Sequence, residues 1–330
     1  MELVEIQYSI DSLWIFKEDI IFKRNNVYTN LESQTIKFVH YKRISYSDKY
    51  IFVVINSNID IYNLKFQKIT TFQVENPVGI AFFDGFSNYI IRCGKEEEKY
   101  LFYHQNILLK EENNVIGILL NRRFRLHFTD PFSAPTYFRC SNLLDTETYW
   151  DYDCGEGKEA GKFYVWNDNL VFTKGNHEGT NLVVIELITG RVLWEIPILY
   201  GAFSFDSERG LLVSFWCSKL SGNNYQIIDL QHKSIENGTP DFSVLLENVA
   251  LNWQMQYLHE NKLYFVDNVY SIHGEPSHAP RFGRFDIKTK RIDFLQEVPE
   301  ASGCQFEQVF YHNSKLYLRS SANQLFIFED

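Results

Sequence analysis

The side chains best suited to chemistry gather in one stretch, VDNVYSIHGEPSHAPR (266–281). It holds Tyr270, His273, Glu275 and His278, which include the imidazole and carboxylate groups that bind metal ions or polar partners. A metal site needs three or four converging ligands, and the spacing of these residues fits no known metal-binding signature. We therefore expect no metal here and assign the four residues to a lid or docking finger that binds a partner. A plain surface loop is the alternative.

A second group is the basic run Arg122, Arg123 and Arg125 in RRFRLHF. If this run is a strand, alternation places Arg123 and Arg125 on one face and Phe124 on the other. Two guanidinium groups on one face suit a carboxylate or a phosphate. We count Arg123 and Arg125 as candidate binding residues, with an exposed sheet edge as the alternative.

Familiar catalytic signatures are absent from the sequence. It contains no GxSxG, GxxxxGK[ST], HExxH or GxGxxG pattern. The acidic run Asp151, Asp153 and Glu156 lacks the spacing of a calcium loop and indicates a solvated turn. We expect a protein that is not an enzyme and has no cofactor, although an active site assembled from single residues on separate repeats stays open.

The overall charge bears on the kind of partner. The 330 residues carry a net charge of −10, which opposes binding to nucleic acid because phosphate contacts need a basic field. A basic protein would suit this charge better, although acidity also serves solubility alone. The five cysteines lie far apart without a CxxC pair, so neither a disulfide framework nor a zinc site is expected.

The N-terminal residues bear on localisation. MELVEIQYSIDS alternates apolar and charged residues and lacks the basic and apolar regions of a signal peptide. No run in the sequence approaches 18 apolar residues. We expect a cytoplasmic protein without membrane contacts.

A repeated element must position these residues. A polar anchor is followed at one position by Leu or Ile and at six by Ile or Val, in YTNLESQTI (28–36), IYNLKFQKI (61–69), VIELITGRV (184–192), IIDLQHKSI (227–235) and RFDIKTKRI (284–292). Weaker copies have their anchors at His104, Asp145 and Glu329. The eight anchors lie 33, 41, 41, 41, 43, 57 and 43 residues apart, which is the repeat length of a propeller blade.

A second repeat marks the start of each unit. FKEDIIF (16–22), WNDNLVF (166–172), HENKLYF (259–265) and HNSKLYL (312–318) share a polar turn followed by an apolar strand start. They predict the hairpin between the first and second strands, with the anchor closing the third strand. The sequence thus predicts an all-β protein, a single β-propeller domain over residues 1–330 with about eight four-stranded blades. Seven blades are the alternative, because the anchors at His104 and Asp145 are weak.

The two chain ends complete one blade in this scheme. LFIFED finishes a third strand and the chain stops, so the last blade lacks its outer strand. ELVEIQYSI has no blade of its own and alternates with a period of two. We expect residues 2–9 to pair with residues 324–330, which closes the propeller and protects two sheet edges.

One repeat resembles a known family. VIELITGRVLW resembles the PQQ-like, or quinoprotein-type, propeller repeat in its acidic Glu186, its Thr189–Gly190 turn and its Trp194. LLDTETYW (143–150) is a looser match. The resemblance implies a propeller fold and does not extend to a cofactor, since the calcium-binding secreted chain and vicinal cysteine pair of PQQ dehydrogenases are not found.

Function is expected at the loops between second and third strands, because propeller binding residues concentrate at one face of the rigid scaffold. The predicted partner-binding residues are Tyr270, His273, Glu275, His278, Trp216, Arg123 and Arg125. A non-catalytic protein-binding propeller is the first hypothesis, in one version an immunity-type inhibitor of a basic toxin. The alternatives are a small-ligand or enzymatic site at the channel mouth and a structural module of a larger assembly. The oligomeric state does not follow from the sequence.

Overall fold

The computed structural model describes residues 1–8, 10, 12–15, 19–47, 49–84, 88–94, 99–113, 117–119, 124–128, 135–142, 147–199, 201–218, 222–242, 255–267 and 279–329. In these residues the chain is almost wholly β-strand, and one 3₁₀ turn, η1 (Pro299–Ala301), is the helical exception. Among them, none forms a helix with the length and hydropathy needed to cross a membrane.

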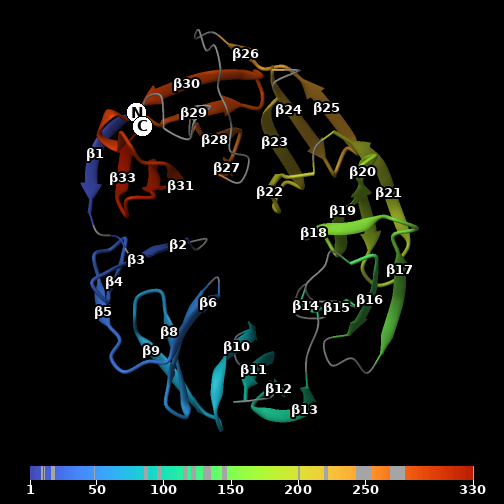
Figure 1. Cartoon of the computed structure of the whole chain (residues 1–330). Helices are drawn as coiled ribbons and strands as arrows, with labels where there is room; N and C mark the ends of the chain where they lie inside the picture. The colour runs from blue at the N-terminus through green and yellow to red at the C-terminus, as the bar shows by residue number, and fades with distance from the viewer. Residues whose placement is uncertain are drawn as a thin grey trace. The chain divides into compact units, whose positions relative to one another are not determined.

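The strands form eight antiparallel sheets, each with the order of a propeller blade, so the prediction of eight four-stranded blades is confirmed (Figure 1). Blade 1 is β2 (Ser12–Ile15), β3 (Ile20–Arg24), β4 (Val27–Asn30) and β5 (Thr35–Lys37). Blade 2 is β6 (Arg43–Ser47), β7 (Tyr50–Ile55), β8 (Asn58–Asn63) and β9 (Lys68–Gln73). Blade 3 is β10 (Pro77–Asp84), β11 (Asn88–Cys93), β12 (Lys99–His104) and β13 (Ile107–Asn113). Blade 4 is β14 (Gly117–Leu119), β15 (Phe124–Phe128), β16 (Tyr137–Asn142) and β17 (Thr148–Asp153).

The remaining blades follow the same order. Blade 5 is β18 (Glu159–Trp166), β19 (Asn169–Asn176), β20 (Gly179–Glu186) and β21 (Val192–Ile198). Blade 6 is β22 (Ser204–Asp206), β23 (Leu211–Ser218), β24 (Gly222–Asp229) and β25 (Ser234–Gly238). Blade 7 is β27 (Gln256–His259), β28 (Lys262–Asp267), β29 (Arg281–Asp286) and β30 (Arg291–Glu297), with β26 (Asp241–Phe242) added in parallel outside β30. Blade 8 is β31 (Phe306–His312), β32 (Lys315–Ser320), β33 (Leu325–Glu329) and β1 (Glu2–Gln7).

The chain divides into two compact units. One consists of residues 1–10, 179–182 and 196–330, and the other of residues 11–178 and 183–195. The first contains blades 6 to 8, and the second contains blades 1 to 4 and most of blade 5. The single domain over residues 1–330 therefore stays a prediction.

The pairing of the two chain ends is confirmed. Strand β1 lies antiparallel to β33, with Leu3 opposite Phe328 and Ile6 opposite Phe326. Both phenylalanines are fully buried, and Leu3 and Ile6 pack against the same cluster. The N-terminal strand thus supplies the outer strand that the last blade lacks, as its period-2 pattern predicts.

Seven of the eight predicted anchors stand at the end of a third strand, whereas Asp145 lies outside the described residues and the third strand of its blade, β16, ends at Asn142. Several anchors also hold the turn that follows. Asp286 Oδ1 accepts hydrogen bonds from the backbone N–H groups of Lys288 and Thr289, at 2.8 and 2.9 Å. In other blades Asn63 Oδ1 and Asp229 Oδ1 accept turn N–H groups in the same way. These side-chain acceptors replace strand pairing where the chain reverses.

In blades 5, 6 and 7 the apolar residue after the anchor joins two turns of its blade. The backbone N–H of Leu187 donates to the carbonyl oxygen of Asp168, which lies in the turn between the first two strands of blade 5. Leu230 and Ile287 make the equivalent bond in blades 6 and 7, and all three side chains are buried. In these three blades the Leu or Ile therefore stabilises the turn end through its backbone hydrogen bond and its buried side chain.

Apolar clusters between successive sheets form the core. Phe52 and Ile59 of blade 2 pack with Tyr89 and Ile91 of blade 3. Phe215 of blade 6 stacks on Phe265 of blade 7 with ring centroids 5.3 Å apart. Within each compact unit, neighbouring sheets thus bury aromatic and aliphatic side chains against each other, in keeping with the high aromatic content of 16%.

Candidate partner-binding site

The predicted site residues divide into two groups. Those outside the described residues are Tyr270, His273, Glu275, His278 and Arg123. Trp216 and Arg125 are described, and their surroundings differ: Trp216 lies half-buried near a loop, whereas Arg125 is buried between two blades.

The ends of the 268–278 insertion are fixed by an ion pair that the sequence-based site did not include. Asp267 ends β28 and Arg281 begins β29, and the two residues face each other in the strand pairing. Arg281 Nε and Nη2 lie 2.8 and 2.5 Å from Asp267 Oδ2, and the carboxylate is fully buried. Burying a carboxylate requires such a charge-assisted partner. The sequence could have pointed to this pair, because Asp267 and Arg281 flank the insertion.

The chain also returns from the insertion along a fixed path. Ala279 and Pro280 are buried. The backbone N–H of Val298 donates to the carbonyl oxygen of Pro280 at 2.9 Å, just before the turn η1. The residues at both ends of the insertion are therefore held by strand pairing, an ion pair and a backbone hydrogen bond.

Trp216 lies at the same end of blade 6 as Asp267 does of blade 7. The preceding residue, Phe215, stacks on Phe265, and its backbone N–H donates to Gln256 Oε1 at 3.3 Å. The Gln256 amide in turn donates to the Phe215 carbonyl oxygen. These contacts fix β23 against blade 7, so the half-buried indole of Trp216 stands where the loops between second and third strands begin.

Arg125 grips a carboxylate of the chain itself. Its Nη1 atom lies 2.8 Å from Glu112 Oε2 on β13 of blade 3, and its guanidinium lies 5.6 Å from the centre of the Phe102 ring. Lys110 also pairs with Glu112. The Arg125 guanidinium thus links β15 of blade 4 to blade 3 through a charge-assisted hydrogen bond.

A Ser–His pair in blade 4 is buried inside the sheet. His127 Nε2 lies 2.8 Å from Ser141 Oγ, a geometry that resembles a nucleophile with its base. The Ser141 hydroxyl also lies within hydrogen-bond distance of the carbonyl oxygen of Asn142, at 2.9 Å. Ser141 is fully buried, so its hydroxyl is out of reach of a substrate. We read this pair as a strand-to-strand support.

The cysteine side chains that the structure describes are mostly enclosed. Cys93, Cys140 and Cys154 are buried, whereas Cys304 is partly exposed. Burial raises the pKa of the Cys140 thiol to about 12 and that of the Cys154 thiol to about 11. These two thiols stay protonated at neutral pH and are poor nucleophiles.

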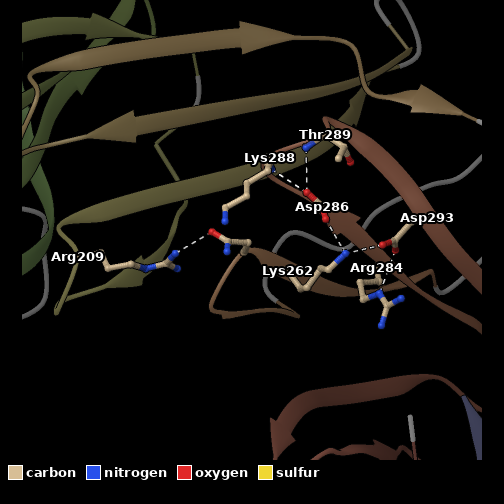
Figure 2. A network of polar contacts seen from close by, with 8 residues as sticks. Arg209, Lys262, Arg284, Asp286, Lys288, Thr289 and Asp293 are labelled. Carbon is tan, nitrogen blue, oxygen red and sulfur yellow. Dashed lines mark hydrogen bonds and ion pairs between the residues drawn. The ribbon is translucent and has the colours of Figure 1, made fainter.

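A charged network lies at the opposite, turn end of blades 6 and 7 (Figure 2). Lys262 Nζ lies 2.6 Å from Asp286 Oδ2 and 2.5 Å from Asp293 Oδ2. Arg284 Nε binds the other oxygen of Asp293 at 2.9 Å. Arg209, in the first turn of blade 6, donates to Asn261 Oδ1 of blade 7 at 3.0 Å. Each of these charged groups has a partner within the chain, so the network stabilises the turns of blades 6 and 7. Within the described residues, no three His, Cys, Asp or Glu side chains are grouped so that they could hold a metal ion.

Comparison with known proteins shows the fold and goes no further. The sequence matches no protein-family profile and no curated protein. BamB from Moraxella catarrhalis, a PQQ-like β-propeller, is similar with a TM-score of 0.55 and 9% identity over 99% of each chain. The Dos1 propeller is similar with a TM-score of 0.54 and 11% identity, covering 99% of this chain and 94% of that one. The computationally designed Ika8 protein gives 0.53 and 9%, covering 100% and 98%. The chain therefore has the β-propeller fold.

Proposed function

We propose that this chain is a non-catalytic protein-binding propeller whose partner contacts the loop end of blades 6 and 7. The observation that carries the proposal is the buried Asp267–Arg281 ion pair, which joins the two ends of the insertion. A long loop on an ordered base is a common way for a rigid scaffold to present binding residues. The proposed contact residues are Trp216, Tyr270, His273, Glu275 and His278.

The partner we propose is a basic protein, and one concrete version is a toxin inhibited by this chain as its immunity protein. The net charge of −10 favours this choice, because opposite charges accelerate the encounter of two proteins. Trp and Tyr supply large contact areas with little loss of conformational freedom, so they often dominate binding energy. Trp216 and Tyr270 have this chemistry.

A small-ligand or enzymatic site is the second candidate from the sequence, and the geometry favours it less. It relied in part on Arg125 to bind an anion, and that guanidinium is occupied by Glu112. Cytoplasmic localisation belongs to the same proposal as the basic partner.

A narrower family relationship is also part of the proposal: blade 5 is a PQQ-like repeat. Thr189 Oγ1 donates to Glu186 Oε2 at 2.5 Å, and Gly190 adopts a φ of 71°. The acidic residue and the Thr-Gly turn thus interact as one unit, which supports the resemblance seen in the sequence.

The test is affinity capture from the native host with the full chain as bait, read by mass spectrometry. We expect one basic protein in stoichiometric amount, with capture reduced at least tenfold by Trp216→Ala or Tyr270→Ala, which corresponds to about 1.4 kcal/mol or more. Lys288→Ala, at the turn end of blade 7, is the matched control and should capture as much as the native chain. Equal capture by all four proteins would place the site elsewhere, and repeated capture of no protein would favour the small-ligand reading.

A further inference from the structure

Strand β13, the outer strand of blade 3, carries three consecutive exposed aliphatic side chains. Ile107, Leu108 and Leu109 are 62%, 43% and 47% exposed. The other large hydrophobic residues known to be exposed in the described chain are not consecutive in sequence, at Val4, Tyr8, Val39, Ile69, Ile188, Val192 and Leu199. Isolated exposed hydrophobic residues are common on protein surfaces, whereas three in succession on the outer strand of a sheet mark a candidate contact for an added strand.

Among the described strands, none pairs with the outer side of β13. In its sheet β13 is the last strand and pairs with β12 alone, with Leu108 opposite Tyr103 and Lys110 opposite Phe102. Leu109 is the additional residue of a bulge between these two pairs. Along an edge strand, every second residue directs its N–H and C=O groups away from the sheet. The edge therefore offers hydrogen-bonding groups and aliphatic side chains together.

The chain itself shows what a blade edge of this protein accepts. Strand β26 lies parallel to β30 on the outside of blade 7, with Asp241 opposite Arg291 and Phe242 opposite Ile292. Its first backbone N–H donates to the carbonyl oxygen of Lys290 at 2.8 Å, and the Asp241 carboxylate lies 3.5 Å from Arg291 Nε. An extended segment with one charge opposite to that of the edge thus occupies the outer side of this blade.

We propose that the edge of β13 is a docking site for an extended segment of another protein, which pairs as a fifth strand of blade 3. The segment would carry aliphatic residues against Ile107–Leu109 and a Lys or Arg toward the exposed Glu111 carboxylate. Charge selects this occupant over a second copy of the chain, because a second copy would bring its own Glu111 and a net charge of −10 to the same edge. Strand addition draws affinity from the main chain and specificity from alternate side chains. The residues of this edge are different from those proposed for the loop end of blades 6 and 7.

The probe is a fluorescein-labelled peptide, KVTVTVK, titrated against the full chain by fluorescence anisotropy. We expect saturable binding, weakened at least tenfold when the backbone of the same peptide is N-methylated at alternate residues. N-methylation keeps charge and side chains and removes the strand-pairing N–H groups. Leu108→Glu should also weaken binding at least tenfold. The matched control, Val192→Glu on the outer strand of blade 5, should bind as the native chain does, since Val192 is similarly exposed at 44%.

A second measurement guards against a variant that fails to fold. In the native chain, saturating peptide should slow hydrogen exchange of backbone amides in residues 107–111 at least tenfold and leave those of β21 unchanged. The proposal is overturned by absence of saturable binding, by equal binding of the N-methylated peptide, or by equal loss in Val192→Glu. Sedimentation showing that the chain dimerises through β13, with Leu108→Glu restoring the monomer, would assign the edge to a second copy and also overturn it.

Discussion

The indole N–H of Trp150, on the outer strand of blade 4, donates a 2.7 Å hydrogen bond to the carbonyl oxygen of Leu187 in blade 5. Leu187 directly follows the anchor Glu186. In blade 2 the corresponding carbonyl, that of Leu64, accepts a hydrogen bond from the Asn30 side chain of blade 1 at 3.2 Å. Leu187 therefore makes two bonds: its N–H donates within its own blade, and its C=O accepts from the preceding blade.

Trp150→Phe is expected to destabilise the protein. The substitution keeps an aromatic ring in the interface and removes the donor, so the buried Leu187 carbonyl loses its strongest partner. We expect a loss of about 1–2 kcal/mol in the free energy of unfolding, measured by urea denaturation. Trp166→Phe is the control, because Trp166 Nε1 is buried without a hydrogen-bond partner among the described residues. A loss in Trp166→Phe as large as that in Trp150→Phe would contradict the role given to the hydrogen bond.

Gly190→Ala should be more harmful than its backbone conformation alone explains. Gly190 has a φ of 71°, which costs an alanine about 1–2 kcal/mol. A Cβ atom at Gly190 would also overlap the Trp150 ring. Gly157 has a similar φ of 65° with open space around its Cβ position, so Gly157→Ala measures the backbone cost alone. We expect the excess cost of Gly190→Ala to disappear in a Trp150→Ala background. Thermal unfolding of the four variants would detect it, and equal costs at Gly190 and Gly157 would exclude the steric contact.

The fold was predictable because the repeated residues contact groups only a few positions away in the sequence. An anchor such as Asp286 bonds N–H groups two and three residues away, so its spacing is visible along the chain. The closing strand was predictable because β1 has a period of two and no blade of its own. The added strand β26 was missed, since two residues are too few for any periodic signal.

The candidate site was much less predictable, because its contacts join residues far apart in sequence. Arg125 has the residue type of an anion ligand, but only the packing of blade 3 on blade 4 shows that Glu112 occupies it. Asp267 and Arg281 are separated by the whole insertion, and strand pairing brings them together. The sequence shows the insertion through the spacing of 57 residues, and leaves its base unspecified.

The charge network of blade 7 should make stability depend on pH through Asp286. Burial by itself would raise the pKa of this carboxyl, but the Lys262 ammonium and the N–H groups of Thr289 and Lys288 outweigh it and lower the pKa from 3.8 to about 2. A lowered folded-state pKa stabilises the protein fully above the unfolded value. The gain is lost as the pH falls from about 4 to about 2.

Asp286→Asn should therefore lose about 2 kcal/mol at pH 7, and the difference from the native chain should shrink as the pH falls from 4 to 2. The substitution removes the charge and keeps an oxygen that accepts the turn N–H groups. Glu32→Gln in the exposed Glu32–Lys65 pair is the control, with an expected effect below about 0.5 kcal/mol. Denaturant unfolding at several pH values gives the comparison. A difference that stays constant from pH 7 to pH 2 would show that the Asp286 charge is not its cause.

Removing one partner of the Arg125–Glu112 pair should lower the free energy of unfolding far more than replacing both partners with apolar residues. Arg125 is 4% exposed, so Glu112→Leu leaves its charge buried without this partner and should lose about 3–5 kcal/mol. Arg125→Met should lose less, because Lys110 still pairs with Glu112. The double variant should be markedly more stable than the sum of the two losses predicts, because it leaves neither charge unpaired. The exposed Arg139–Asp151 pair gives the matched cycle, in which the two losses should simply add because solvent screens the pair. Urea unfolding of both cycles decides the point: additive losses at Arg125 and Glu112 would mean that the guanidinium is held by something other than this carboxylate, and would return Arg125 to the candidates for binding a ligand.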